Sequence, residues 1–170
     1  AVAGIEGAAV VLAQLEVPVA SVAAALRAGR AAGALTILNA APAHVATIDM
    51  LGDVDVLVVN ETECAELGGI DRLHAAGARV IVLTQGAGGV TLHRTGEQPL
   101  HIDAFRIDPV DTTGAGDAFC GALAAALSQE ERIEQALVRA CAAGAVVAQH
   151  RGATTSELSP ASIAALVLSR

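Results

Sequence analysis

The segment from Asp111 to Asp117 reads DTTGAGD and directly precedes an apolar run, Ala118 to Leu127, that is typical of a helix. Its glycines allow a tight turn and a close approach of the backbone to a ligand. The N–H groups of a first helical turn have no partner within the helix, and with the helix dipole they favour an anion. The segment therefore predicts an anion site suited to a phosphoryl group.

Asp117 falls in the first turn of this expected helix, where the dipole stabilises its carboxylate. A carboxylate placed there could take the proton from an alcohol that attacks a phosphoryl group. An acidic residue is also common at this place for a purely structural reason, because it complements the positive end of the helix. The residues alone leave both interpretations open.

Composition limits how phosphate could be held. All ten basic residues are arginines, so the chain has no P-loop, protein-kinase or Schiff-base lysine. Phosphate must therefore be bound by backbone N–H groups, arginine or a metal. The five histidines and three cysteines lack the spacing of a metal site, and an odd cysteine count favours a reducing cytoplasm.

Charge and hydropathy argue against two classes of partner. A net charge of −8 and the lack of Trp and Tyr argue against nucleic-acid binding. The apolar runs, such as Phe119 to Leu127, are shorter than the roughly 20 residues that a bilayer span needs, so no membrane segment is predicted. The chain opens without a basic leader and its one methionine is Met50, so we expect a missing upstream segment.

The elements that must position these residues follow a βαβ pattern within one α/β domain, residues 1–170. Short aliphatic runs predict four buried parallel strands: Ala9–Ala13, Leu35–Asn39, Val54–Asn60 and Arg79–Thr84. Helices are expected at Ser21–Ala32, with Ser21 as N-cap and Gly33 as the stop, and at Thr62–Leu67, Asp71–Ala76, Ala115–Leu127, Ile133–Gln149 and Pro160–Leu168, the last capped by Ser159. Two antiparallel strands are expected between them, Val90–His93 and His101–Ile107.

The nine residues DTTGAGDAF, with Gly121 following, resemble the second signature of the ribokinase, or phosphofructokinase-B, family of carbohydrate kinases. The resemblance implies a ribokinase-like three-layer α/β/α fold with a mainly parallel, Rossmann-like sheet. It implies that the backbone of Gly114, Ala115 and Gly116 forms an anion hole for the γ-phosphoryl group of ATP. In the same way it implies that Asp117 takes the proton from a sugar hydroxyl.

Further motifs occur in family order. Asn60 and Glu63 resemble an Asn-x-x-Glu motif linked to phosphate and Mg²⁺, although Val59 stands where many relatives have proline; a polar helix start is the structural alternative. The run from Thr84 through Gly86 to Gly89 resembles a Thr-x-Gly-x-x-Gly strap beside the nucleotide, for which a plain turn is the alternative. Cys141 departs from the His or Asn that relatives often place near adenine.

A monovalent-cation loop is also implied by the resemblance. Its first half corresponds to Asp111 and Thr113, and its second half supplies oxygens of Val147, His150, Gly152 and Ser156 to K⁺. Backbone carbonyls can supply such ligands whatever the side chains are. An ordinary helix C-terminal turn at Gly152 remains an alternative.

The strings around Glu16 and from Leu38 to Ala43 look more like ribokinases than fructokinases or adenosine kinases, and place Glu16 near the sugar pocket or, alternatively, at an exposed sheet margin. Ribose is the first choice of substrate, and a homodimer is expected for the full-length protein. Complete relatives carry upstream strands, a sugar-binding motif and a lid, so this chain alone could bind nucleotide without turnover. The alternatives are another sugar or nucleoside kinase of the family and a non-catalytic nucleotide-binding remnant. A dinucleotide-binding Rossmann domain is disfavoured because no G-x-G-x-x-G follows the first strand.

Overall fold

The computed structural model describes residues 4–170, which fall into two compact units. The first unit runs as far as Gln85 and includes Thr91–His101. The second unit consists of Gly86–Val90 and Ile102–Arg170. The single domain expected over residues 1–170 stays a prediction.

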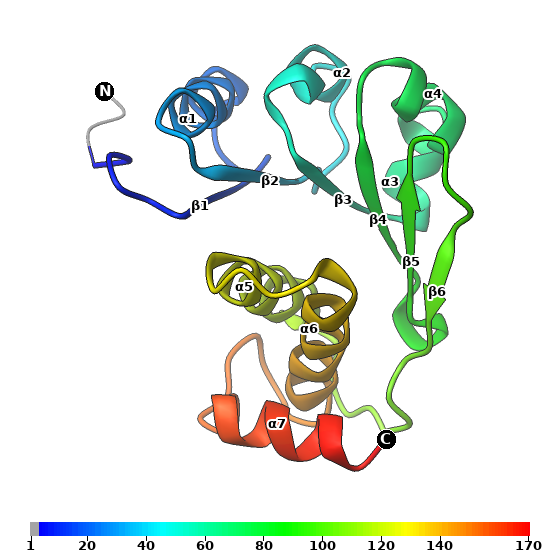
Figure 1. Cartoon of the computed structure of the whole chain (residues 1–170). Coiled ribbons are helices and arrows are strands. Elements are labelled where there is room, and N and C mark those ends of the chain that lie inside the picture. The colour runs from blue at the N-terminus through cyan, green and yellow to red at the C-terminus, as the bar shows by residue number, and fades with distance from the viewer. Residues whose placement is uncertain (1–3) are drawn as a thin grey trace. The chain divides into compact units, whose positions relative to one another are not determined.

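Six strands form one sheet in the order β1-β2-β3-β4-β5-β6 (Figure 1). They are β1 Val10–Gln14, β2 Leu35–Asn39, β3 Val56–Asn60, β4 Val80–Thr84, β5 Val90–Arg94 and β6 Leu100–Ile102. Strands β1 to β4 are parallel neighbours. The connections before β5 and β6 are too short for a parallel crossover, so these two strands run antiparallel to their predecessors. The prediction of a mainly parallel sheet is confirmed.

The helices of the first unit pack against one face of this sheet. They are α1 Val19–Ala31, α2 Thr47–Met50, α3 Glu61–Glu66 and α4 Ile70–Ala75, with a short 3₁₀ turn, η1 Leu51–Asp53. Leu26 of α1, Leu57 of β3 and Leu73 of α4 are fully buried in a common core. Removing such side chains from water drives the packing of this unit, because each contributes roughly 1.5–3 kcal/mol when fully buried.

Some boundaries in the first unit differ from the sequence predictions. Helix α1 begins at Val19 after Pro18, so Ser21 lies inside the helix and does not cap it. Proline has a backbone angle already suited to a helix start, which explains the earlier beginning. The helix ends before Gly33, as predicted. Helix α2 and the η1 turn were not predicted, because so short a run shows no helical period.

Three helices dominate the second unit: α5 Ala115–Ser128, α6 Ile133–Ala148 and α7 Pro160–Leu168. Helix α6 packs through a face of small residues, since Ala136, Ala140 and Ala143 are fully buried. A Cβ atom on Gly144 of α6 would lie 3.1 Å from the carbonyl oxygen of Ala115. Small side chains therefore let α5 and α6 approach closely.

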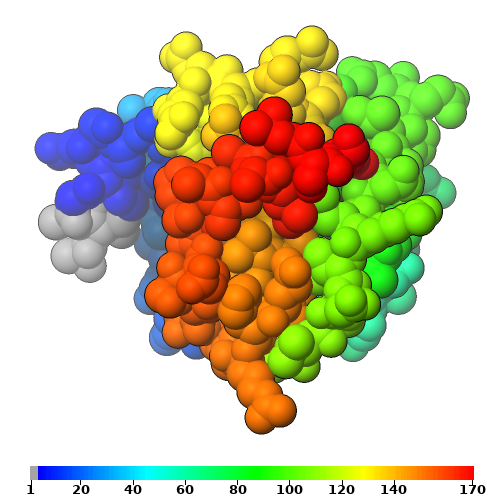
Figure 2. Space-filling view, turned by 90° about the horizontal axis from the view of Figure 1, so that it is seen from below, coloured from blue at the N-terminus to red at the C-terminus, as the bar shows by residue number. Residues whose placement is uncertain are grey.

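Helix α7 lies on the surface of the second unit, in red on the face shown in Figure 2, and has no fully buried residue. Ser159 caps it as predicted, because its hydroxyl accepts a hydrogen bond from the N–H of Ser162 at 3.1 Å. The Arg170 side chain beyond this helix donates to the Asp103 carbonyl at 3.2 Å and lies over the ring of Phe105.

The prediction of a strand over His101–Ile107 is wrong beyond Ile102. Strand β6 ends at Ile102, and the residues that follow have no strand pairing. Gly89 lies against the backbone of Ile102 and Ala104, at a position where any Cβ would clash. The ladder thus ends at Ile102, although apolar residues continue along the sequence after it.

None of the helices formed by residues 4–170 has the length and apolar character needed to cross a bilayer.

Candidate active site

The DTTGAGD segment leads into α5 through a left-handed turn at Gly114, the N-cap of the helix, with φ 77° and ψ −3°. Only glycine adopts this conformation without strain. A Cβ on Gly114 would also fall inside van der Waals contact with the carbonyl oxygen of Ala153. Glycine is therefore required here for two independent reasons, backbone angle and close packing.

The first turn of α5 presents free backbone donors, as the sequence predicts. The N–H of Ala115 is already used, because it donates to the Thr112 carbonyl at 3.1 Å. The N–H groups of Gly114, Gly116 and Asp117 donate to no acceptor within residues 4–170. Space beside Gly116 is open, since a Cβ there would meet nothing within 4 Å. The Asp117 N–H belongs to the first-turn donors that the sequence predicts, although the family resemblance implies only the backbone of Gly114, Ala115 and Gly116.

Asp117 is the third residue of α5 and is exposed. Its carboxylate forms no ion pair or side-chain hydrogen bond with any residue that the structure describes. The carboxylate thus stands beside free N–H donors and an open surface. This arrangement suits a base next to an anion site.

The carboxylate of Asp111 joins the two segments that the sequence assigns to a cation loop. Its Oδ1 accepts from the N–H of Thr113 at 3.0 Å, and its Oδ2 accepts from the N–H of Gly152 at 2.9 Å. The hydrogen bond from Gly152, followed by those from Thr113, lowers the pKa of Asp111 to about 2. The carboxylate is therefore ionised at neutral pH and ties the turn before α5 to the turn after α6.

The other predicted members of the cation loop lie around the end of α6. The Val147 carbonyl accepts from the N–H of His150 at 2.9 Å, as in an ordinary helix C-terminal turn. The carbonyls of Thr113, His150 and Gly152 accept no hydrogen bond within the part of the chain that the structure describes. Ser156 lies exposed in the following turn. These free carbonyls are the kind of oxygen that a monovalent cation takes, so the residues present fit such an ion.

We expect Asp111→Asn to flatten the pH dependence of stability at acid pH. The pKa of Asp111, about 2 in the folded protein, lies below the ordinary value of about 3.9. The carboxylate therefore stabilises the fold above about pH 4, and this contribution is lost as the pH falls towards 2. Thermal melts between pH 7 and pH 2.5 should show wild type losing its advantage over the variant below pH 4.

A matched control for that experiment is Asp108→Asn, which removes the charge of an exposed aspartate whose side chain forms no hydrogen bond or ion pair within residues 4–170. It should follow the wild-type profile between pH 4 and pH 2.5. An Asp111→Asn profile parallel to wild type over the whole range would show that the link to Gly152 does not form in solution.

In the first unit, three predicted site positions lie at one edge of the sheet. Glu16 follows β1 in an exposed turn, Asn60 ends β3, and Thr84 ends β4. Since β1 to β4 are parallel, these are all carboxyl ends of strands, which is where open α/β sheets bind ligands. The sheet thus brings Glu16, Asn60 and Thr84 to a common edge.

Asn60 and Glu63 form a capping box at the start of α3. The Asn60 Oδ1 accepts from the N–H of Glu63, and the Glu63 Oε2 accepts from the N–H of Asn60, each at 2.8 Å. The structural alternative given by the sequence, a polar helix start, is therefore present. The box uses only one carboxylate oxygen, and Oε1 of Glu63 is left for another ligand. Carboxylate and amide oxygens are ligands that Mg²⁺ binds, so Asn60 and Glu63 fit that ion.

The strap after β4 is a glycine-rich turn. A 3₁₀ turn, η2, covers Gly86–Gly88, and Gly86 and Gly89 have positive φ angles of 54° and 92°. The N–H of Gly89 donates to the Gly86 carbonyl at 3.0 Å. Thr84 ahead of it contacts the Val59 carbonyl through its hydroxyl at 3.4 Å. The turn therefore exposes backbone and carries almost no side chains.

Cys141 lies in α6, mostly buried, and burial raises the pKa of its thiol to about 11. It is a protonated small apolar side chain rather than a nucleophile.

Within residues 4–170, no group of three or more His, Cys, Asp or Glu side chains is arranged so that it could hold a metal ion.

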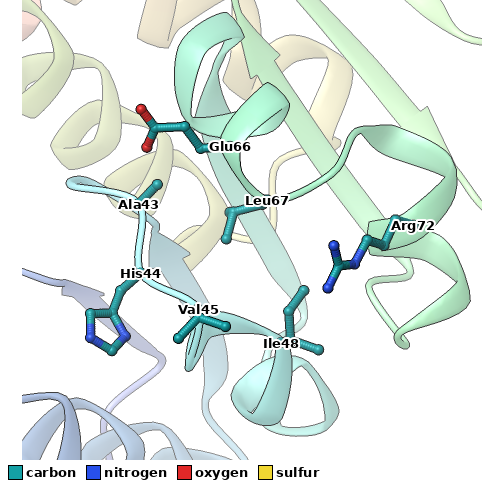
Figure 3. Close-up of a pocket in the computed structure, with 7 residues that line it drawn as sticks. All are labelled: Ala43, His44, Val45, Ile48, Glu66, Leu67 and Arg72. Atoms are coloured by element: carbon teal, nitrogen blue, oxygen red, sulfur yellow. The ribbon is translucent and has the colours of Figure 1, made fainter.

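A surface pocket of about 240 Å³ lies in the first unit, between the segment after β2 and the α3–α4 region (Figure 3). None of the residues predicted for the site lines it. Its lining combines apolar side chains with one carboxylate, one imidazole and one guanidinium group. The lining residues are Ala43, His44, Val45, Ile48, Glu66, Leu67 and Arg72.

Comparison with known proteins shows the family to which this chain belongs. Residues 2–160 match the family described as pfkB family carbohydrate kinase. The chain belongs to this family, and the resemblance seen in its DTTGAGD segment is confirmed. The predicted ribokinase-like α/β fold is confirmed as well, by the solved structures that the chain resembles.

Within the family, the chain is similar to ribokinases. The Staphylococcus aureus ribokinase is 33% identical over 86% of this chain and 52% of its own length. A Salmonella typhi deoxyribokinase is 36% identical over 84% of this chain and 51% of its own length. The Arabidopsis thaliana ribokinase, solved with ribose and ATP, superimposes with a TM-score of 0.87 at 28% identity, over 96% of this chain and 57% of that one. The chain spans about half the length of the curated relatives it matches.

Proposed function

We propose that the protein carrying this chain is an ATP-dependent sugar kinase that transfers the γ-phosphoryl group of ATP to a sugar hydroxyl. D-ribose, giving ribose 5-phosphate, is the first choice of substrate. The observation that carries the proposal is the start of α5, where an exposed Asp117 stands beside the free N–H groups of Gly114 and Gly116. Membership of a carbohydrate kinase family supports it.

In the proposed reaction, Asp117 accepts the proton of the sugar hydroxyl as its oxygen attacks the γ-phosphorus. A bond forms between that oxygen and phosphorus, the bond from phosphorus to the β–γ bridging oxygen breaks, and ADP leaves. The free N–H groups of Gly114, Gly116 and Asp117, at the positive end of α5, stabilise the charge on the transferred group. The Ala115 residue shapes this turn, while its own N–H stays on the Thr112 carbonyl.

Nucleotide and Mg²⁺ are assigned to the carboxyl-end loops of the sheet. Glu63, with its unused oxygen, and Asn60 would hold Mg²⁺ directly or through water, and the ion would neutralise phosphate charge. Thr84, Gly86 and Gly89 would border the nucleotide through exposed backbone. Cys141 would contribute a small apolar contact near the adenine.

A monovalent cation, K⁺ rather than Na⁺, is proposed for the loop that Asp111 closes. The backbone oxygens of Asp111, Thr113, Val147, His150 and Gly152, with Ser156, would hold it. The hydrogen bond between Asp111 and Gly152 supports this assignment because it brings the two halves of the loop together.

Glu16 at the end of β1 is the candidate sugar contact. The Salmonella typhi relative named deoxyribokinase makes 2-deoxyribose a second candidate substrate. We propose a cytoplasmic homodimer with no nucleic-acid partner, in line with the net charge of −8.

The test is a coupled ADP-release assay of the protein that carries this chain. Ribose, 2-deoxyribose, fructose and adenosine would be compared at equal concentration, each in potassium and in sodium chloride. We expect the highest kcat/KM with ribose, and a higher rate in potassium. Equal rates in potassium and in sodium chloride would contradict the proposed monovalent-cation site. ATP binding by calorimetry without turnover of any acceptor would favour a non-catalytic nucleotide-binding protein.

A further inference from the structure

A short chain of polar side chains joins Gln85, directly before the glycine strap of residues 86–89, to Thr91, two residues after it. The Thr91 hydroxyl of β5 lies 2.8 Å from the Oε1 of Gln85, the first residue after β4. The same hydroxyl lies 3.0 Å from the Nδ1 of His101 in β6. One hydroxyl thus links the end of β4 to both strands of the following hairpin.

The chemistry of a hydroxyl makes this arrangement directional. Threonine has one O–H donor and can also accept, so it donates to one neighbour while accepting from the other. If it donates to the Gln85 amide oxygen, His101 donates to it through Nδ1–H. If the amide is turned so that its NH₂ donates, Thr91 donates to the Nδ1 of His101. Either way the three groups form one continuous hydrogen-bonded chain.

The strap, residues 86–89, lies between Gln85 and Val90, and the pairing of Thr84 with Asn60 in the sheet holds the residue before Gln85. Residues 86–89 read GAGG, and glycines lose the most conformational freedom when they are ordered. Gly89, at the far end, is packed against the backbone of Ile102 and Ala104. At the near end, the bridge to Thr91 holds the side chain of Gln85, the residue directly before Gly86, and adds to the pairing of β4 with β3.

We propose that Thr91 is a positioning residue for nucleotide binding. Its hydroxyl holds Gln85 and His101, sets the start of the 86–89 strap, and so reduces the entropy that ordering the strap against a nucleotide would cost. The inference rests on the proposed kinase function, because it assigns the strap to the nucleotide. Thr91 itself need not touch the ligand.

The test compares Thr91→Val, which keeps the β-branched shape but removes the hydroxyl, with Thr91→Ser, which keeps the hydroxyl. We expect Thr91→Val to raise the Kd and KM for ATP by roughly three- to tenfold, as for one lost hydrogen bond. The KM for the sugar should stay within about twofold of wild type. Thr91→Ser should restore most of the ATP affinity. ATP Kd is measured by calorimetry, both KM values by steady-state kinetics, and folding by thermal melts.

Gln85→Leu removes the same bridge from its other end and gives a second, independent variant should Thr91→Val not fold. It should weaken ATP binding to a similar extent. ATP affinity unchanged in the folded variants, a Thr91→Ser as weak as Thr91→Val, or equal losses for ATP and sugar would each overturn the inference. Those results leave the kinase function standing, whereas a wild-type protein that binds no ATP refutes both.

Discussion

Asp117→Asn is expected to lower kcat by about 10² to 10⁴, equivalent to roughly 3–5 kcal/mol of activation barrier, while ATP affinity stays nearly unchanged. An amide has the shape of the carboxylate but cannot accept the hydroxyl proton. The N–H donors at the start of α5 belong to the backbone, so they still face the phosphate. Single-turnover kinetics and ATP calorimetry on this variant separate the two quantities.

A matched control is Asp71→Asn, because Asp71 is also an exposed aspartate in the first turn of a helix, α4. It should cost at most about 1 kcal/mol of stability through the helix dipole and leave kcat unchanged. If Asp117 had only the same structural role, its variant would behave like the control. An Asp117→Asn enzyme that keeps more than roughly a third of the wild-type kcat would contradict the assignment of the base.

Gly114→Ala should destabilise the protein by about 2–5 kcal/mol. The new Cβ would occupy a left-handed backbone position and clash with the carbonyl oxygen of Ala153. The clash would involve backbone atoms of Ala153 rather than a flexible side chain. Relieving it therefore requires the start of α5 or the 152–153 turn to move. Urea unfolding of the variant and of wild type measures the loss directly.

The control for this substitution is Gly121→Ala in the same helix. Gly121 is exposed, its φ is not positive, and an added Cβ would meet nothing within 4 Å. Alanine there should be neutral or stabilise the protein by about 0.5–1 kcal/mol. Equal stabilities of the Gly114 and Gly121 variants would mean that the turn before α5 does not pack against Ala153.

The sequence predicts the elements of the fold well where a periodic pattern is long. The aliphatic strands and the α5 and α6 helices are present close to their expected residues, because alternation and 3.6-residue periodicity follow directly from burial of one face. The end of β6 could not be predicted in the same way. That strand ends where Gly89 packs against the backbone of Ile102 and Ala104, and no local pattern encodes this contact.

For the site, the sequence locates the DTTGAGD turn and its helix but not how the donors are used. That the Ala115 N–H is occupied by the Thr112 carbonyl depends on the turn geometry. The bond from Gly152 to Asp111 and the bridge from Gln85 to Thr91 depend on contacts between side chains and loops that only the folded chain brings together. Outside the site, the buried Thr36 hydroxyl donates a hydrogen bond to the Asp55 carboxylate, a partner that residue type alone does not reveal.

The most direct test of the proposed phosphoryl transfer is ³¹P NMR of the protein incubated with MgATP and ribose. We expect the γ-phosphate signal of ATP to disappear as a sugar phosphate monoester and ADP appear in equal amounts. Formation of this monoester should require both ribose and Asp117. Release of inorganic phosphate in place of the monoester, or an unchanged ATP spectrum from a protein that binds ATP, would contradict the account.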